Sequence, residues 1–255
     1  MGRLVKVLKQ GLTQFTNYNR PAGWFFLSFV RVFRAGGCEF NLSRNLFPSG
    51  YYSRFLFKTY ESPEIVLTKK YLIPSDSIIE LGACIGVVSC ISNKILEKPE
   101  NHVVVEANPD LIKEIEKNRV NNDCHFSVEN AIVSNRKFET FYTYNIAISG
   151  SMQKKVHNPK LILSREVQVK GLGFQELQSK YGLKFTALLM DIEGAEYALI
   201  EENLEFLKTL RLLIIEFHPN IMQELDTEKY HVYLTELGFE LVETVEKTSV
   251  YTRSI

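Results

Sequence analysis

Carboxylates concentrate where one apolar segment of the sequence ends. Asp191, Glu193 and Glu196 follow directly after the apolar residues 187–190. Attraction between an acid and the first turn of a helix would account for Glu196 and in part for Glu193. It does not account for Asp191, which ends the strand that we predict over 185–191. A carboxylate in such a place can remove a proton from a substrate, so Asp191 is the first catalytic candidate and Glu193 is the third.

A further acid and a histidine close the next apolar segment along the chain. Glu216 lies near the end of the strand predicted over 210–217, and His218 follows it. Histidine changes charge near neutral pH, which makes His218 the second catalytic candidate; a structural role is the alternative. Carboxylates and imidazole also bind several metals, so a divalent cation on Asp191, Glu216 and His218 is a further alternative. The prediction we adopt is a site without a metal.

Two glycines stand where a predicted strand gives way to a predicted helix. In the sequence E-L-G-A-C-I-G of residues 80–86, Gly82 and Gly86 allow a tight turn and close approach of a ligand to the backbone. The dinucleotide fingerprint G-x-G-x-x-G is not met, because Cys84 occupies its second glycine position. The spacing suits a cofactor without a pyrophosphate, and Glu80 suits the cationic head group of an amino acid. A purely structural turn is the alternative.

Polar residues follow two more apolar segments. Glu106 ends the strand predicted over 102–106, about 20 residues beyond the glycine loop, where an acid can bond ribose hydroxyls. Asn108 already suits the role of helix N-cap, which leaves Glu106 for a ligand. Asn130 beside the small Ala131 could contact the edge of an adenine; a simple polar turn is the alternative.

Strands and helices alternate from about residue 60 onwards. Apolar strands that alternate with helices are typical of an α/β fold with a mostly parallel sheet and helices on both faces, here closed by a C-terminal antiparallel hairpin. Residues 146–164 have no clear period and are predicted as a loop or flap. The predicted strands are 77–81, 102–106, 125–129, 138–145, 185–191, 210–217, 239–243 and 249–253. The predicted helices are 85–96, 109–120, 195–202 and 219–237, with a short one at the end of 168–180.

The N-terminal part of the chain has a different character. We predict a basic, aromatic extension over residues 1–59 and the main domain over residues 60–255. Apolar residues recur at helical spacing within residues 1–35, with a break at N-R-P and an aromatic stripe over 25–33. Aromatic residues around the sequence P-S-G predict a β-hairpin over 40–58.

Charge is unevenly distributed along a chain whose formal net charge is zero. Residues 1–70 carry 11 basic and 3 acidic residues, whereas residues 71–255 carry 19 and 27. A basic arm with aromatic residues predicts contact of residues 1–35 with an anionic surface, either a membrane or an acidic glycan. The alternatives are that the arm pairs with the acidic body, packs as core, or forms a homodimer contact.

Taken together, these segments resemble a known family. The sequences E-x-G-A-x-I-G, V-E-A-N-P, N-A-I-V-S, M-D-I-E-G-A-E and I-E-F-H-P are similar to those of FkbM-family methyltransferases, which use S-adenosylmethionine on the class I methyltransferase fold. The resemblance covers about residues 60–253, and D-I-E-G-A-E is its most specific part. The family usually has Asn where this chain has Cys84.

The resemblance implies a role for each of these positions. Glu80 and the two glycines of the loop would hold the methionine part of the cofactor, and Glu106 the ribose. Asn130 with Ala131 would hold the adenine side, and Asp191 would lie near the transferring methyl group. The predicted cofactor-binding set is Glu80, Gly82, Ala83, Cys84, Gly86, Glu106, Ala107, Asn130, Ala131 and Asp191.

The family resemblance predicts an O-methyltransferase that acts on a hydroxyl of a sugar or glycan. No N-P-P-Y-type sequence follows Asp191, which argues against methylation of base or amide nitrogens, and no nucleic-acid partner is expected. The alternative is a non-catalytic binding module of the same fold, whose basic extension contacts an anionic surface. Four cysteines without metal-binding spacing are typical of reduced thiols, so we predict a cytoplasmic protein, peripheral at the membrane where the extension binds.

Overall fold

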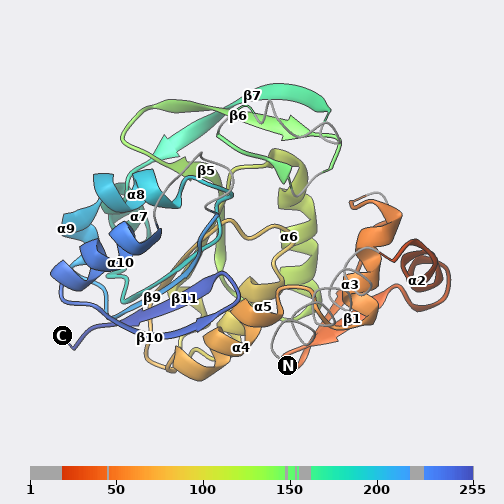
Figure 1. Cartoon of the computed structure of the whole chain (residues 1–255), viewed down its shortest axis with the longest axis horizontal. Coiled ribbons are helices and arrows are strands. Elements are labelled where there is room, and N and C mark those ends of the chain that lie inside the picture. Colours follow the sequence, from red (N-terminus) through yellow and green to blue (C-terminus); the bar gives the residue numbers. More distant parts are fainter. Residues whose placement is uncertain are drawn as a thin grey trace, which may run out of the picture. The chain divides into compact units, whose positions relative to one another are not determined.

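The computed structural model describes residues 19–44, 46–146, 149–152, 154, 162–218 and 227–254 (Figure 1). The chain divides into two compact units, Met1–Ser62 and Pro63–Ile255. The helix expected over the first residues lies outside the described residues, as do most of the expected flap and the start of the helix expected from residue 219.

Within the described part of the second unit, nine strands form one sheet, in the order β10-β11-β9-β8-β3-β4-β5-β7-β6. Strands β3, β4, β5, β7, β8 and β9 run parallel to at least one neighbour, whereas β6, β10 and β11 pair antiparallel. The strands are β3 (Ile78–Leu81), β4 (His102–Glu106), β5 (Ser127–Val133), β6 (Phe138–Tyr144), β7 (Leu163–Leu172), β8 (Ala187–Met190), β9 (Leu212–Glu216), β10 (Glu240–Val245) and β11 (Thr248–Thr252).

Helices cover both faces of this sheet (Figure 1). Ile79 and Leu81 of β3 pack in one core cluster with residues of the C-terminal helices, whereas Ile78 of the same strand packs in another with Leu67. Successive strand residues point to opposite faces, so a strand that is apolar throughout needs a helix layer on each side. The predicted α/β fold is therefore confirmed. The helices are α4 (Ser62–Tyr71), α5 (Val87–Asn93), α6 (Pro109–Asn121), α7 (Phe174–Tyr181), α8 (Glu196–Glu202), α9 (Leu204–Leu207) and α10 (Thr227–Glu236), with a 3-10 turn η3 (Pro99–Asn101).

The first unit differs from the sequence prediction. Its described part, residues 19–44 and 46–62, contains α2 (Arg20–Phe25), a π-helical turn η1 (Phe26–Val30), β1 (Val32–Ala35), β2 (Cys38–Asn41), a 3-10 turn η2 (Ser49–Tyr52) and α3 (Ser53–Leu56).

The predicted hairpin over 40–58 is wrong. The hairpin lies over residues 32–41 instead, because Gly36 and Gly37 adopt the positive φ values, 58° and 87°, that a two-residue turn requires. The sequence P-S-G instead leads into η2, and Tyr52 and Phe55 of η2 and α3 are buried in an aromatic core.

The aromatic stripe expected over 25–33 is also divided. Phe25 and Phe29, four residues apart in the helical segment, are exposed, whereas Phe26 of the same segment is buried. Phe33 is also buried, but it lies in β1, since the helical segment ends at Val30.

Candidate active site

The carboxyl ends of β3, β4 and β8 meet at one edge of the sheet, where ligands bind in folds of this type. The backbone N–H of Gly82 donates to the carbonyl oxygen of Val105 at 3.0 Å, and that of Asp191 donates to Leu81 at 3.0 Å. The glycine loop and the acidic segment after β8 are therefore connected through the backbone.

Position 82 requires a glycine because the backbone of Asp191 lies close to it. It has φ = +81°, and a Cβ atom there would lie 1.8 Å from the backbone oxygen of Asp191. The close approach that we expected toward a ligand is thus an approach to the neighbouring strand end. Gly86 has φ = +78° and its nearest contact for a Cβ atom is Ile115 at 3.5 Å, so it supplies the turn before α5.

Glu106 lies beneath the same loop. It is 5% exposed, and its two carboxylate oxygens accept the backbone N–H groups of Cys84 at 2.9 Å and Asn108 at 2.7 Å. Burial raises the pKa of Glu106 to about 7, against the effect of these hydrogen bonds. The backbone N–H of Ala83 is a third hydrogen-bond donor to this carboxylate. A carboxylate has about four acceptor sites, so Glu106 retains capacity for one further donor such as a hydroxyl group. The residue therefore fits the ribose contact that the sequence predicts.

Asn130 joins this group. Its Nδ2 donates to the carbonyl oxygens of Glu106 at 2.8 Å and Ala107 at 3.1 Å, which fixes the turn after β4. Ala131 is buried beside it and pairs with Lys170 of β7. The structure thus brings Asn130, Glu106 and the glycine loop together. Asn130 lies within β5, which continues to Val133, so the prediction that the strand ends before Asn130 is wrong.

Glu80 has a different environment. It is 3% exposed, its Oε1 accepts from the hydroxyl of Ser89 at 2.6 Å, and its Oε2 lies 3.0 Å from Nε2 of His102. Both carboxylate oxygens therefore have partners within the domain. Its expected contact with the amino-acid part of a cofactor stays a prediction.

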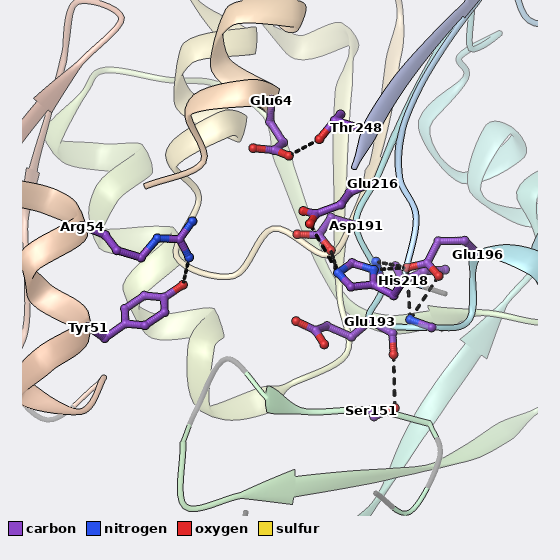
Figure 2. A network of polar contacts seen from close by, with 12 residues as sticks. Tyr51, Arg54, Glu64, Ser151, Asp191, Glu193, Glu196, Glu216, His218 and Thr248 are labelled. Carbon is purple, nitrogen blue, oxygen red and sulfur yellow. Dashed lines mark hydrogen bonds and ion pairs between the residues drawn. The ribbon is translucent and has the colours of Figure 1, made fainter. Parts of the chain in front are cut away.

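The catalytic candidates meet around His218, which is 8% exposed (Figure 2). Its Nδ1 lies 2.9 Å from Oε1 of Glu196. Its Nε2 lies 3.5 Å from Oε1 of Glu216 and 3.7 Å from Oδ1 of Asp191. The ends of β8 and β9 thus bring together the two acids and the histidine that the sequence singled out.

Glu196 was missed as a site residue, since attraction to the helix dipole is a sufficient explanation for an acid at that position. It is fully buried, and it accepts the backbone N–H groups of Ile192 at 3.2 Å and Gly194 at 3.1 Å as well as contacting His218. The available signal was its position on the apolar face of α8, three and four residues before Leu199 and Ile200. An acid on a buried helix face needs partners, and here they orient both the loop and the imidazole.

The carboxylates in this cluster retain protons more readily than usual. Burial and the negative charges of Glu216 and Glu193 raise the pKa of Asp191 well above its usual value. Burial and the charge of Glu64 raise the pKa of Glu216 to about 7. Burial alone would lower the pKa of His218, but its hydrogen bond to Glu196 and the surrounding charges raise it. The cluster can therefore take up and release protons near neutral pH.

The described part of the expected flap reaches this cluster. Ser151 is buried, and its hydroxyl donates to the backbone oxygen of Glu193 at 3.5 Å (Figure 2). Ser151 also pairs with Tyr142 of β6 through a β-bridge. Glu193 itself has φ = 52°, so its backbone is held in the left-handed region beside the site.

The same cluster has ligand spacing for a metal. Asp191, Glu196 and His218 each offer one ligand atom, and these atoms lie within 4.8 Å of one another. Carboxylate and imidazole together suit several divalent ions.

Two solved structures of methyltransferases are similar to this chain. The magnesium protoporphyrin IX methyltransferase of Synechocystis PCC 6803, solved with bound S-adenosylmethionine, is 11% identical at a TM-score of 0.45, over 96% of this chain and 97% of that one. An S-adenosylmethionine-dependent methyltransferase of Aquifex aeolicus is 13% identical at a TM-score of 0.39, over 75% and 88%. No curated protein matches the sequence.

The family comparison is decisive. The model of the methyltransferase FkbM domain matches residues 80–241, which include the glycine loop, Glu106, Asn130 and the whole cluster around His218. This match spans more than half of the chain and confirms the predicted family, whose cofactor is S-adenosylmethionine. The protein belongs to the FkbM family of S-adenosylmethionine-dependent methyltransferases.

Proposed function

We propose that this methyltransferase acts on a hydroxyl oxygen of a sugar or glycan. The observation that carries the proposal is the group of proton acceptors around His218, next to the loop that fits the cofactor. A hydroxyl group is a poor nucleophile until its proton has an acceptor, and a positioned base contributes about 10²–10⁴-fold. The presence of this cluster beside the glycine loop favours catalysis over the alternative of a non-catalytic binding module.

Each residue has a distinct task in this proposal. S-adenosylmethionine supplies a methyl group on a positively charged sulfur. Asp191 accepts the proton of the acceptor hydroxyl, with Nε2 of His218 as the second candidate and Glu193 as the third. Glu196 holds the imidazole by its contact with Nδ1 at 2.9 Å, so that Nε2 faces Asp191 and Glu216.

The acceptor class is tested with the methyl-labelled cofactor and a panel of mono- and oligosaccharides, with peptides and nucleosides as controls. We expect label on a saccharide, at an oxygen that product mass spectrometry identifies. Label on nitrogen or carbon would contradict the proposal while leaving methyltransferase activity intact.

Glu106→Ala should weaken binding of S-adenosylmethionine by about 1–3 kcal/mol, because a buried carboxylate loses its ribose partners. Calorimetry measures the effect, and Glu97→Ala, an exposed acid before η3, is the matched control. The pKa of about 7 adds a second readout, since hydroxyl donors favour the ionised carboxylate. Wild-type affinity should fall below pH 7, and the variant should lose that dependence. Unchanged affinity in Glu106→Ala would remove the residue from the cofactor site.

We further propose that the first unit docks on an anionic lipid surface. The side chains of Trp24 and Phe29 are 61% and 69% exposed, and their rings lie 6.0 Å apart. The basic side chains Arg20 and Arg31 are exposed in the same segment. None of the helices in the described part of the chain is long and apolar enough to cross a membrane. Surface attachment through aromatic insertion and basic charge is the mode that these residues support.

Flotation with vesicles that contain anionic lipid measures this docking. Each basic residue near such a surface contributes about 1 kcal/mol, so wild-type protein should float at low salt and less at high salt. Trp24→Ala with Phe29→Ala should abolish flotation, whereas Phe138→Ala, an exposed aromatic of the second unit, should not. A wild-type protein that stays at the bottom of the gradient at low salt rules out lipid docking. A change of oligomeric state in the double variant would assign Trp24 and Phe29 to a homodimer contact instead.

A further inference from the structure

The imidazole of His218 is surrounded by acceptors. Nδ1 faces Oε1 of Glu196 at 2.9 Å, whereas Nε2 faces carboxylate oxygens of Glu216 and Asp191 at 3.5 and 3.7 Å. A neutral ring that donates from Nδ1 to Glu196 would point the lone pair of Nε2 at two further acceptors. That arrangement needs a proton or a metal ion between Nε2 and the two carboxylates.

A carboxylate oxygen of Asp191 that faces His218 also has no hydrogen-bond donor among the described residues. Oδ1 of Asp191 is buried and accepts no hydrogen bond from any residue that the structure describes. Buried carboxylate oxygens in proteins normally have a donor or a cation as partner. The same atom is the one that faces Nε2 of His218, so the missing partner belongs between them.

The charges around this point do not balance. Glu193, Glu196 and Glu216 all act electrostatically on His218, and Asp191 lies beside them. Lys247 is the basic side chain that acts on Glu216 together with His218. With all four carboxylates ionised, a single imidazolium would leave the cluster with an excess of negative charge, and a divalent cation would offset it.

We propose that a divalent cation binds between Nε2 of His218 and the carboxylates of Asp191 and Glu216. Glu196 then acts as an outer carboxylate that fixes the tautomer and orientation of the histidine, an arrangement common around metal-bound histidines. Neighbouring ligand atoms around a six-coordinate ion with bonds of about 2.1 Å lie about 3 Å apart, so small side-chain movements close the observed distances. One imidazole with carboxylates suits Mn²⁺ better than Mg²⁺, because Mg²⁺ prefers oxygen ligands alone.

The role of this cation rests on the proposed function, methylation of a hydroxyl oxygen. A cation there would bind the oxygen of the acceptor hydroxyl and lower its pKa, as metal ions do for bound water. With Asp191 and His218 engaged as ligands, Glu193 would be the acceptor of the proton.

Titration of the chelator-treated protein with Mn²⁺, followed by electron paramagnetic resonance, tests the site without cofactor or acceptor. We expect one tightly bound ion per chain, with nitrogen coupling from one imidazole. His218→Ala should remove that coupling, and Asp191→Asn or Glu216→Gln should weaken binding at least tenfold. His125→Ala is the matched control, since His125 lies 3.6 Å from Asp123 on the surface.

The outcomes separate this site from the proposed function. Absence of tight Mn²⁺ binding to the wild type, or binding unchanged in Glu216→Gln and Asp191→Asn, overturns the proposal and leaves an imidazolium as the cation of the cluster. Circular dichroism establishes that each variant folds, and Glu216→Gln keeps the shape of the site if His218→Ala does not. Binding of S-adenosylmethionine is measured separately in the presence of a chelator. Absence of metal binding would therefore not contradict cofactor binding, and absence of cofactor binding would not contradict the metal site.

Discussion

Replacing Asp191 by asparagine should lower the rate of methyl transfer, whether Asp191 accepts the proton itself or holds a cation that activates the hydroxyl. We expect a loss of about 10²–10⁴-fold, the usual contribution of a positioned proton acceptor. The substitution keeps the size of the side chain and removes its charge and basicity. The backbone contact of Asp191 with Leu81 does not involve the side chain, so the position of the loop should be retained. Single-turnover measurements with saturating cofactor give the rate, and calorimetry should give an unchanged cofactor affinity.

The stability of the same variant separates a functional role from a structural one. Burial and neighbouring carboxylates raise the pKa of Asp191, so its ionised form destabilises the folded state at neutral pH. Asp191→Asn should therefore leave the unfolding temperature unchanged or raise it. Asp123→Asn, at an exposed position with φ = 49°, is the control and should change neither activity nor stability. Full activity in Asp191→Asn would show that Asp191 has only a structural role after β8.

Gly82→Ala should be the most destabilising single-methyl substitution in the glycine loop. The new Cβ atom would meet the backbone oxygen of Asp191 at 1.8 Å, which no side-chain rotation relieves. We expect a loss of about 4 kcal/mol or more, a size that single substitutions reach only through a specific structural defect. Urea unfolding measures the loss, with cofactor binding as a second readout because the loop must shift.

Gly182→Ala provides the matched control for this substitution. Gly182 also has positive φ, +65°, but no atom of the described residues lies within 4 Å of the position that a Cβ atom would take there. Backbone strain alone should therefore cost this variant about 1–2 kcal/mol. Equal losses in the two variants would mean that the contact between Gly82 and Asp191 is relaxed easily and does not fix the loop.

Local signals in the sequence were sufficient to predict most strands and helices of the second unit. The run H-V-V-V-E predicts β4 with its observed bounds, because a short apolar strand is followed at once by a polar residue. Asn108, Pro109 and Asp110 predict the start of α6, and the side chain of Asn108 does accept the N–H of Asp110 at 3.0 Å. Each of these signals depends on residues close together in the chain.

Features that depend on distant residues were not predictable in the same way. Glu80 meets His102 and Ser89 in the interior, and nothing in its neighbourhood in the sequence indicates those partners. Glu196 resembles an ordinary acid of a first helical turn until His218 is placed beside it. In the first unit, aromatic residues fit a strand or a helix equally well, so the hairpin was assigned to the wrong segment.

The hydrogen bond from residue 84 to Glu106 is made by the backbone, and this has an evolutionary consequence. Every residue except proline carries this N–H group, so other substitutions at this position leave the bond chemically intact. The chain can therefore carry Cys84 where its relatives usually carry asparagine and still hold the carboxylate that fits the ribose. Divergence at residue 84 is limited by its backbone, which has φ = 51° and favours residues such as asparagine, whereas Gly82, whose contact excludes every side chain, should stay under stronger purifying selection.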